Sequence, residues 1–220
     1  LVGSEMCIRD SPCMFLFINL AFAALLGFFY LVQQFLSWEF YVFWFVIYLE
    51  LIQAAWISSE PQVKIKYKLT HTAIGISFLL LLVLSTVMYF AMRRPNFLAS
   101  ILGFTLCVAA FVLRHYGIKN LGASFSEHIR TPKRLITTGL YKDVRHPIYG
   151  SSIMLVIGMP LILNAYLALS ASLLAITFIL IRTELEEKSL CRDVPNYKKY
   201  IKRTNKFFPS RLGPVRQSQV

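Results

Sequence analysis

The sequence has few acidic residues and lacks the short motifs that mark soluble nucleotide-binding enzymes. Its 220 residues include 23 Lys and Arg but only 11 Asp and Glu, so the formal net charge is +12. No G-x-G and no G-x-x-x-x-G-K-[ST] segment occurs, which argues against a Rossmann fingerprint and a P-loop. Apolar residues make up 56% of the chain, above the roughly 45–50% of soluble domains. We therefore expect an integral membrane protein.

Patterns typical of metal sites and disulfide frameworks are also missing. The four histidines form no H-x-x-H, H-x-x-x-H or H-H pair, which argues against a histidine-rich di-iron site. The cysteines show no C-x-x-C spacing, so we interpret all four as free thiols: Cys7, Cys13, Cys107 and Cys191. No metal site is predicted.

Long uncharged runs divide the chain into an N-terminal and a C-terminal part. Residues 1–11 have no apolar period and resemble translated read-through of a sequencing adapter, so we treat them as a non-native leader. Residues 12–113 contain four apolar runs near the length that crosses a bilayer, ~20 residues: 13–32, 40–57, 72–92 and 97–113. A cleaved signal peptide is the alternative reading of the first run.

The C-terminal part, residues 114–220, contains a basic loop over 114–146, an apolar helical hairpin over 148–182 and a basic tail. Its two apolar runs, 148–163 and 166–181, are short and joined by a tight turn. The expected fold class is all-α, with five to six transmembrane helices and interfacial cytoplasmic segments.

The basic residues predict the orientation of this protein. In a six-helix arrangement, 21 of the 23 Lys and Arg fall on one side of the membrane, against Arg93 and Arg94 on the other. The positive-inside rule then places both termini and the 114–146 loop in the cytoplasm. Anionic lipid attracts basic residues near its surface by ~1 kcal/mol each. We therefore expect membrane lipid as a partner, and no nucleic acid.

Two polar residues lie inside the second apolar run. Glu50 and Gln53 are three residues apart and share a helix face. Such residues either bond to a neighbouring helix or contact a substrate. An alternative function is that of a non-catalytic transporter or assembly protein, in which these two residues would line a path through the membrane. That alternative requires a polar face in several runs, and only this run has one.

Two polar clusters bracket the hairpin and form the candidate active site, because a hairpin returns its two ends to one membrane face. The first cluster comprises Arg145, His146 and Tyr149, and the second comprises Arg182, Glu184, Glu186 and Glu187. Pro147 suits the first turn of a helix, where its missing N–H leaves no bond unmade. In the simplest alternative, the second cluster is a solvated helix end with an i,i+4 pair between Glu184 and Lys188.

The spacing of these residues resembles the isoprenylcysteine carboxyl methyltransferase family, which belongs to a wider group with the phospholipid N-methyltransferases. The resemblance covers about residues 114–210 and rests on three segments: Tyr141-x-x-x-Arg145-His146-Pro147-x-Tyr149, Arg182-x-x-x-Glu186-Glu187-x-x-Leu190 and Tyr197-x-x-Tyr200. The chain departs from the family where Lys133 replaces a frequent His. The usual Phe-Gly before the last segment is also absent, and the spacing there is one residue short.

The resemblance implies that the C-terminal half binds S-adenosylmethionine and methylates a lipophilic carboxylate, thiol or amine at the cytoplasmic membrane face. The implied cofactor-binding residues are Arg134, Leu135, Ile136, Tyr141, His146, Pro147, Ile148, Tyr149 and Glu186. The implied catalytic residues are Arg145, Arg182 and Glu187, with Arg182 on the acceptor side. Sterol reductases share a related C-terminal region, so an NADPH-dependent reductase is the alternative enzyme class.

The residue types suit this cofactor. A carboxylate such as Glu186 can pair with its ammonium group, and Arg145 or His146 can pair with its carboxylate. Tyr141 and Tyr149 offer aromatic faces to the adenine or to the sulfonium cation. An ionised carboxylate acceptor needs no general base, so holding the two reactants in line would supply most of the catalysis.

Overall fold

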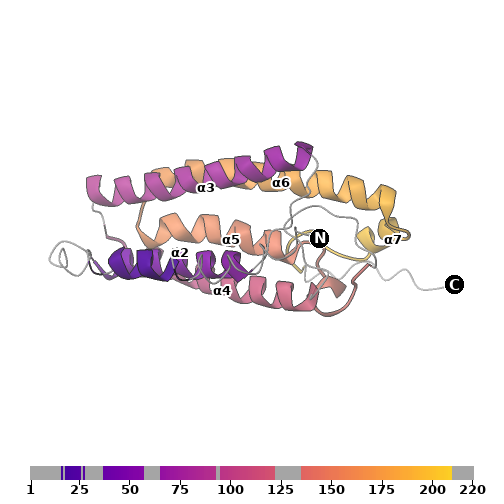
Figure 1. The fold of residues 1–220 in the computed structure, drawn as a ribbon, viewed down its shortest axis with the longest axis horizontal. Coiled ribbons are helices and arrows are strands. Elements are labelled where there is room, and N and C mark those ends of the chain that lie inside the picture. Colours follow the sequence, from indigo (N-terminus) through magenta and orange to yellow (C-terminus); the bar gives the residue numbers. More distant parts are fainter. Residues whose placement is uncertain are drawn as a thin grey trace, which may run out of the picture. The chain divides into compact units, whose positions relative to one another are not determined.

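The computed structural model describes residues 16, 18–25, 27, 37–56, 65–92, 95–121 and 135–209. Over these residues the regular elements are all helices, with one isolated β-bridge between Val144 and Asn205 (Figure 1). The predicted all-α class is therefore confirmed for the described part of the chain. The chain divides into two compact units, which meet in sequence at Pro61 and Gln62.

The first unit contains α2, which spans Trp38–Trp56. Tyr48 of this helix stacks on Phe22 with ring centroids 3.9 Å apart, and its hydroxyl donates a hydrogen bond to Asn19. These contacts pair α2 with the helical residues 18–25.

Helix α2 agrees with the second predicted run, 40–57. The leader over 1–11 and much of the first run lie outside the described residues. Glu50 lies in α2, but the side chain of Gln53 is not described, so their shared face stays a prediction.

Among the described residues of the second unit, four helices are long: α3 (Ile65–Ala91), α4 (Phe97–Leu121), α5 (Pro147–Ile162) and α6 (Leu169–Asp193). Helix α3 packs along α6, and α4 packs along α5 (Figure 1). Three short helices complete the unit: η3 (Gly139–Lys142), η4 (Tyr166–Ala168) and α7 (Tyr197–Ile201).

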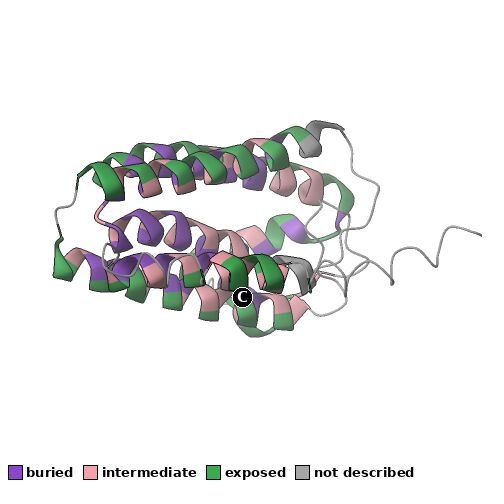
Figure 2. Ribbon diagram, turned by 60° about the vertical axis from the view of Figure 1, so that its left-hand side comes forward, coloured by how far each residue is buried: buried purple, intermediate pink, exposed green. Residues whose placement is uncertain are grey.

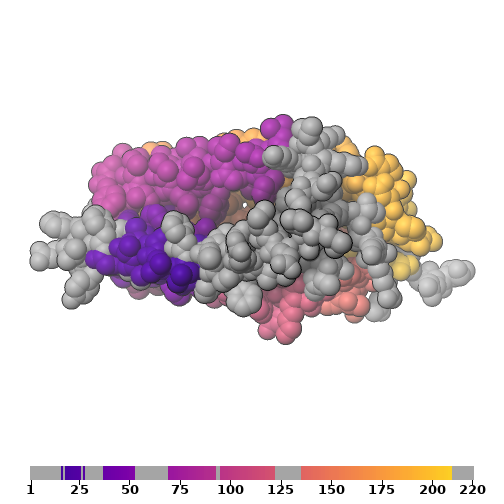
Figure 3. All heavy atoms as spheres, viewed as in Figure 1, coloured from indigo at the N-terminus to yellow at the C-terminus, as the bar shows by residue number. Residues whose placement is uncertain are grey.

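Three described helical segments are long and apolar enough to cross a membrane: Leu69–Ala91, Phe97–Leu121 and Tyr166–Asp193. Helix α5 is apolar but has only 16 residues. The side chains of Leu79, Val83 and Phe90 on α3 are exposed. Atoms of α3 form part of the molecular face shown in Figure 3. Buried positions instead lie where the helices pack together (Figure 2). This pattern suits lipid contact and supports an integral membrane protein, while the count of five to six spans stays a prediction.

Two helices extend beyond the apolar runs that predicted them. Helix α4 continues past residue 113 to Leu121, so the start of the predicted 114–146 loop is helical, and a Cβ atom on its Gly117 would lie 2.9 Å from Cγ1 of Ile148 on α5. Helix α6 continues beyond residue 181 to Asp193. The residues after 181 are rich in Leu, Glu and Lys, which favour helix even after the apolar run has ended. The second polar cluster therefore lies within α6, and the helix does not end there.

Glycines allow α4 and α5 to approach closely in the middle of the bundle. A Cβ atom on Gly103 would lie 2.6 Å from the carbonyl oxygen of Gly158 and 2.6 Å from the nitrogen of Ile162. A Cβ atom on Gly158 would lie 2.8 Å from Sγ of Cys107. Small residues at helix crossings are typical of membrane bundles, where van der Waals packing drives association.

The turn between α5 and η4 is bonded to the first turn of α4. The hydroxyl of Ser100 donates to the carbonyl oxygen of Ile162 at 3.0 Å, and the side-chain amide of Asn164 donates to Ser100 at 2.9 Å. Asn96 caps α4 by accepting a bond from the N–H of Ala99 at 3.2 Å. With this end held, the start of α5 and the polar part of α6 meet at the opposite end of the unit.

We predict that Gly103→Ala destabilises the protein. The added methyl group would collide with the backbone of α5, and overpacking of this kind costs ~1–3 kcal/mol. For a chain of this size, each 1 kcal/mol lowers the Tm by ~2–4 °C. Thermal unfolding of detergent-solubilised protein would measure the shift.

The matched control is Gly75→Ala, since a Cβ atom at Gly75 in α3 would meet no atom within 4 Å. Its Tm should equal or slightly exceed that of the wild type, because Ala favours helix over Gly. Equal Tm values for the two variants would contradict the close approach of α4 and α5.

Candidate functional site

The site is organised at the first turn of α5. His146 precedes this helix and Pro147 is its first residue, as the sequence predicted. The N–H of Gly150 donates to the carbonyl oxygen of His146 at 3.0 Å and so closes the first turn. The fixed φ of Pro147 favours this helix start, and the helix start directs Arg145 and His146 toward α6.

Glu187 of α6 binds both of these basic side chains. Its Oε1 accepts a hydrogen bond from Nε of Arg145 at 3.0 Å and lies 2.9 Å from Nε2 of His146. All three side chains are largely removed from solvent, and His146 is 5% exposed. Charge-assisted bonds in such a setting are stronger than neutral ones. This cluster locks the start of α5 to the polar part of α6.

Arg182 joins three helices. It is 3% exposed, and its Nε donates to the hydroxyl of Tyr149 on α5 at 2.9 Å. Its Nη1 lies 3.5 Å from the hydroxyl of Thr70 on α3. Its guanidinium group therefore sits inside the bundle, one turn before the two acidic residues of α6.

Glu186 faces a group of phenols. Its carboxylate interacts electrostatically with the hydroxyl groups of Tyr141, Tyr149 and Tyr197. Burial raises the pKa of Tyr141 well above its usual value, and the charge of Glu186 raises it further. Burial likewise raises the pKa of Tyr197, with smaller contributions from Glu187 and Glu186. Both phenols therefore keep their protons near pH 7.

Glu186 and Glu187 differ in their ion pairing. Glu187 forms two ion pairs, whereas Glu186 forms none with the residues that the structure describes. Glu184, two residues earlier, is 60% exposed and pairs with Lys206 at 3.2 Å. The Glu184–Lys188 pair of the simplest alternative is not among the ion pairs of the described residues, where Glu184 instead contacts the C-terminal segment.

The remaining predicted cofactor residues lie in packing positions. Leu135 packs against the buried cluster that includes Tyr197 of α7. Ile148 lies against Gly117 of α4, where a Cβ atom would be 2.9 Å from its Cγ1. Pro147 is also buried, and its Cγ atom lies 3.8 Å from the position that a Cβ atom on Gly117 would occupy.

The structure thus brings most of the predicted site together. Ile136 is half-buried in the segment that leads to η3, whereas Arg134 lies outside the described residues and stays a prediction. Thr70 was not predicted, and no feature of its local sequence indicates a role. Tyr200 was noted only as part of a motif, yet it donates to the carbonyl oxygen of Tyr141 at 2.6 Å.

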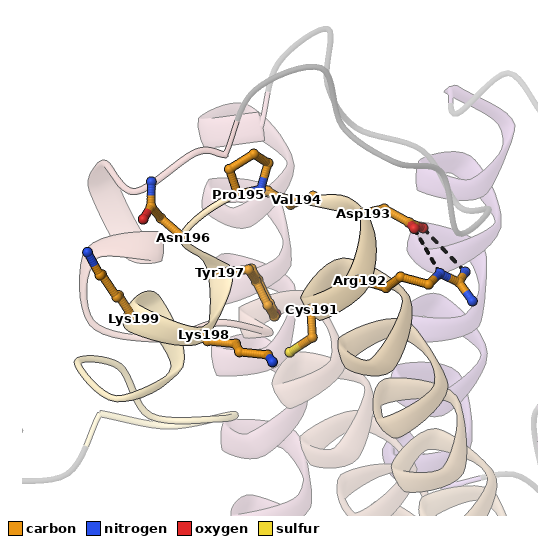
Figure 4. Close-up of a pocket in the computed structure, with 9 residues that line it drawn as sticks. All are labelled: Cys191, Arg192, Asp193, Val194, Pro195, Asn196, Tyr197, Lys198 and Lys199. Carbon is orange, nitrogen blue, oxygen red and sulfur yellow. Dashed lines mark hydrogen bonds and ion pairs between the residues drawn. The ribbon is translucent and has the colours of Figure 1, made fainter.

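A shallow hollow of about 440 Å³ lies at the turn between α6 and α7 (Figure 4). Its lining runs from Cys191 to Lys199, with the exposed pair of Arg192 and Asp193 at one side. None of the predicted site residues lines it. We assign it no function.

Metal binding receives no support from the described residues, which contain no group of three or more His, Cys, Asp or Glu side chains that could hold an ion. The described cysteines, Cys107 and Cys191, are not joined in a disulfide bond. The polar chemistry of this site is therefore that of carboxylates, phenols, guanidinium groups and one imidazole.

Comparison with known proteins gives one positive finding. Residues 101–192 match the model of the isoprenylcysteine carboxyl methyltransferase (ICMT) family. The match begins inside α4, earlier than the resemblance predicted, and it ends before α7. It includes both polar clusters. No curated protein matches the chain significantly.

We predict that Glu187→Gln destabilises the protein, because it removes the charge that holds Arg145 and His146. Hydrogen bonds to charged groups are worth ~1.5–3 kcal/mol each, which corresponds to a loss of several degrees in Tm. Glu184→Gln is the control, since an exposed pair contributes ~0–1 kcal/mol. Thermal unfolding in detergent should separate the two variants, and a wild-type Tm for Glu187→Gln would contradict the locking role.

Proposed function

We propose, from the match of residues 101–192 to the model of the isoprenylcysteine carboxyl methyltransferase family, that the protein transfers a methyl group from S-adenosylmethionine to a lipophilic acceptor. The acceptor class is a carboxylate, thiol or amine attached to an apolar body. The family match supports a methyltransferase, and the apolar helices support a membrane location. No observation favours the alternative of an NADPH-dependent reductase.

The observation that carries the proposal is the environment of Glu186. A carboxylate beside three phenols, without an ion pair among the described residues, suits a ligand with cationic groups. Aromatic rings attract cations through their faces, and a carboxylate pairs strongly with an ammonium group. S-adenosylmethionine carries both an ammonium and a sulfonium. The residues present therefore fit the cofactor.

The structure changes how we assign the basic residues. The Arg145 side chain bonds to Glu187 and to two backbone carbonyls, and His146 bonds to Glu187. We therefore assign these three residues the task of holding the site together. Tyr141, Tyr149 and Glu186 are the residues that would hold the cofactor.

Arg182 is assigned to the acceptor side. It lies on α6 where the apolar part of that helix meets the polar part. Its guanidinium group forms hydrogen bonds to the hydroxyl groups of Tyr149 and Thr70. An acceptor with an apolar body would arrive from the bilayer, and its anionic head would be drawn to this guanidinium. The lipid-soluble acceptor would then meet a water-soluble cofactor at the membrane surface.

S-adenosylmethionine, when bound, supplies an electrophilic methyl group. The protein's own residues position the reactants and exclude water. The buried rings of Tyr141 and Tyr197 would keep water from one side of the site and so lower the local dielectric, which strengthens electrostatic contacts. An ionised carboxylate acceptor leaves no proton to remove, so positioning would be the main contribution of the protein.

We place this site on the cytoplasmic face. The first turn of α5, the polar part of α6 and α7 lie at one end of the second unit, and α7 carries Lys198 and Lys199. At the opposite end α3 ends at Ala91 and α4 begins at Phe97, and the sequence between these two helices contains only two basic residues, Arg93 and Arg94. The excess of basic residues at the site end supports the cytoplasmic assignment through the positive-inside rule.

Glu186→Gln should weaken S-adenosylmethionine binding about 10- to 150-fold, since a charge-assisted contact is worth ~1.5–3 kcal/mol. The substitution keeps the size of the side chain and removes only its charge. Titration calorimetry of the purified protein measures the affinity. A parallel titration with NADPH tests the reductase alternative.

Glu184→Gln is the matched control, because it removes an exposed charge from the same helix at a position paired with Lys206. It should bind S-adenosylmethionine as tightly as the wild type. Wild-type affinity in Glu186→Gln would defeat the cofactor-pairing role of Glu186. Failure of the wild-type protein to bind S-adenosylmethionine would defeat the proposed function.

Cysteine labelling tests the orientation. In a variant with the native cysteines replaced by serine, Lys198→Cys should react with a membrane-impermeant maleimide only after the cytoplasmic side is opened. Asn96→Cys, at the exposed start of α4, should react from the outside. The reverse pattern would overturn the assignment.

A further inference from the structure

The segment after α6 contacts the proposed cofactor side of the site, although it lies beyond the family match, which ends at residue 192. We call residues 200–207 the C-terminal strap. The strap runs beside residues 141–146, which lead into α5.

Backbone bonds attach the strap along its length. The N–H of Asn205 donates to the carbonyl oxygen of Asp143 at 2.9 Å, and the N–H of Arg145 donates to the carbonyl oxygen of Asn205 at 2.8 Å. The N–H of His146 donates to the carbonyl oxygen of Lys206 at 2.9 Å. Val144 and Asn205 form a parallel bridge. The strap therefore fixes the backbone of the residues that carry the Arg145–His146 pair.

Side chains add three further bonds. Nη1 of Arg145 donates to the carbonyl oxygens of Ile201, at 3.1 Å, and of Thr204. The buried hydroxyl of Tyr200 donates to the carbonyl oxygen of Tyr141 at 2.6 Å. The last of these bonds connects α7 directly to η3, which presents the Tyr141 ring.

Near its last residue, the strap packs so closely on Gly150 of α5 that no side chain would fit at that glycine. A Cβ atom on Gly150 would lie 2.8 Å from the carbonyl oxygen of Phe207. The ring of Phe207 lies near His146, with centroids 6.3 Å apart. A methyl group at Gly150 would therefore push the strap away from the first turn of α5 without removing any polar group.

We propose that Tyr200 is a positioning residue that holds Tyr141 in place for cofactor binding, so that the cofactor site is complete only with the C-terminal strap. Tyr200 does this through the bond to the Tyr141 backbone. This inference rests on the proposed function, and it names a contribution from residues outside the family match.

The protonation of Tyr200 agrees with this role. Burial raises its pKa to about 12, although the charge of Arg145 acts in the opposite direction. The phenol therefore keeps its proton and remains a donor to Tyr141 throughout the physiological pH range. The hydroxyl of Thr204 also donates to the carbonyl oxygen of Tyr200 at 2.8 Å, and this bond joins the end of α7 to the residues that follow the helix.

The decisive variant is Tyr200→Phe in the full chain, which keeps the ring and removes the donor. Amide hydrogen exchange over residues 138–146 should become about 5-fold faster, since one neutral hydrogen bond is lost. This readout includes the N–H groups of Arg145 and His146, which are bonded to the strap. The affinity for S-adenosylmethionine, measured well below the Tm, should fall about 3- to 10-fold.

Gly150→Ala tests the same idea by a different physical route, since it displaces the strap while Tyr200 stays intact. It should produce the same pattern of exchange and the same loss of affinity. Two controls apply the same substitutions elsewhere: Tyr166→Phe in the exposed η4, and Gly75→Ala on the open face of α3. Both controls should leave exchange over residues 138–146 and cofactor affinity unchanged.

The outcomes separate the two proposals. If the wild type binds S-adenosylmethionine and Tyr200→Phe binds it equally well, the positioning role is overturned and the proposed function stands. Unchanged exchange in Tyr200→Phe overturns it as well. If the wild type binds no S-adenosylmethionine, the proposed function fails, and the positioning role fails with it.

Discussion

The site depends on one carboxylate oxygen. Oε1 of Glu187 contacts both Arg145 and His146, and each of these residues has a second attachment. Arg145 reaches the carbonyl oxygens of Ile201 and Thr204, while the backbone of His146 begins α5. Removing one partner from a largely buried ion pair leaves an uncompensated charge, which is costly. The charge of Glu187 therefore holds α5, α6 and the C-terminal strap in one arrangement.

Three acidic residues on one stretch of α6 differ because a helix turns by about 100° per residue. Glu187 faces the start of α5, where its carboxylate forms ion pairs with two basic side chains. Glu186, one residue earlier, lies beside the phenols. Glu184 faces solvent and Lys206. Adjacent residues of the same type thus have different physical tasks, and only Glu186 has a charge that the described protein does not pair.

The rest of the second unit makes this arrangement rigid. The close crossing at Gly103 and Gly158 sets the separation of α4 and α5, and the bonds of Ser100 hold the opposite end. Packing and interhelical hydrogen bonds must supply this rigidity, because lipid offers helices no hydrophobic reason to associate. Arg182 adds a polar contact between α3, α5 and α6 at the site end.

The sequence by itself determined the helical class, the apolar hairpin and the two polar clusters at its ends, because hydrophobic run length and the position of Pro147 are local properties. Through the spacing of Arg145, Arg182 and Glu186 it also indicated the similarity to the family whose model matches residues 101–192. Only the tertiary structure decided that Glu187 binds Arg145 and His146, that Thr70 reaches Arg182, and that Tyr200 bonds to Tyr141. Each of these contacts joins residues more than 40 positions apart, and side-chain pairing at that distance follows from helix packing, which no local pattern encodes.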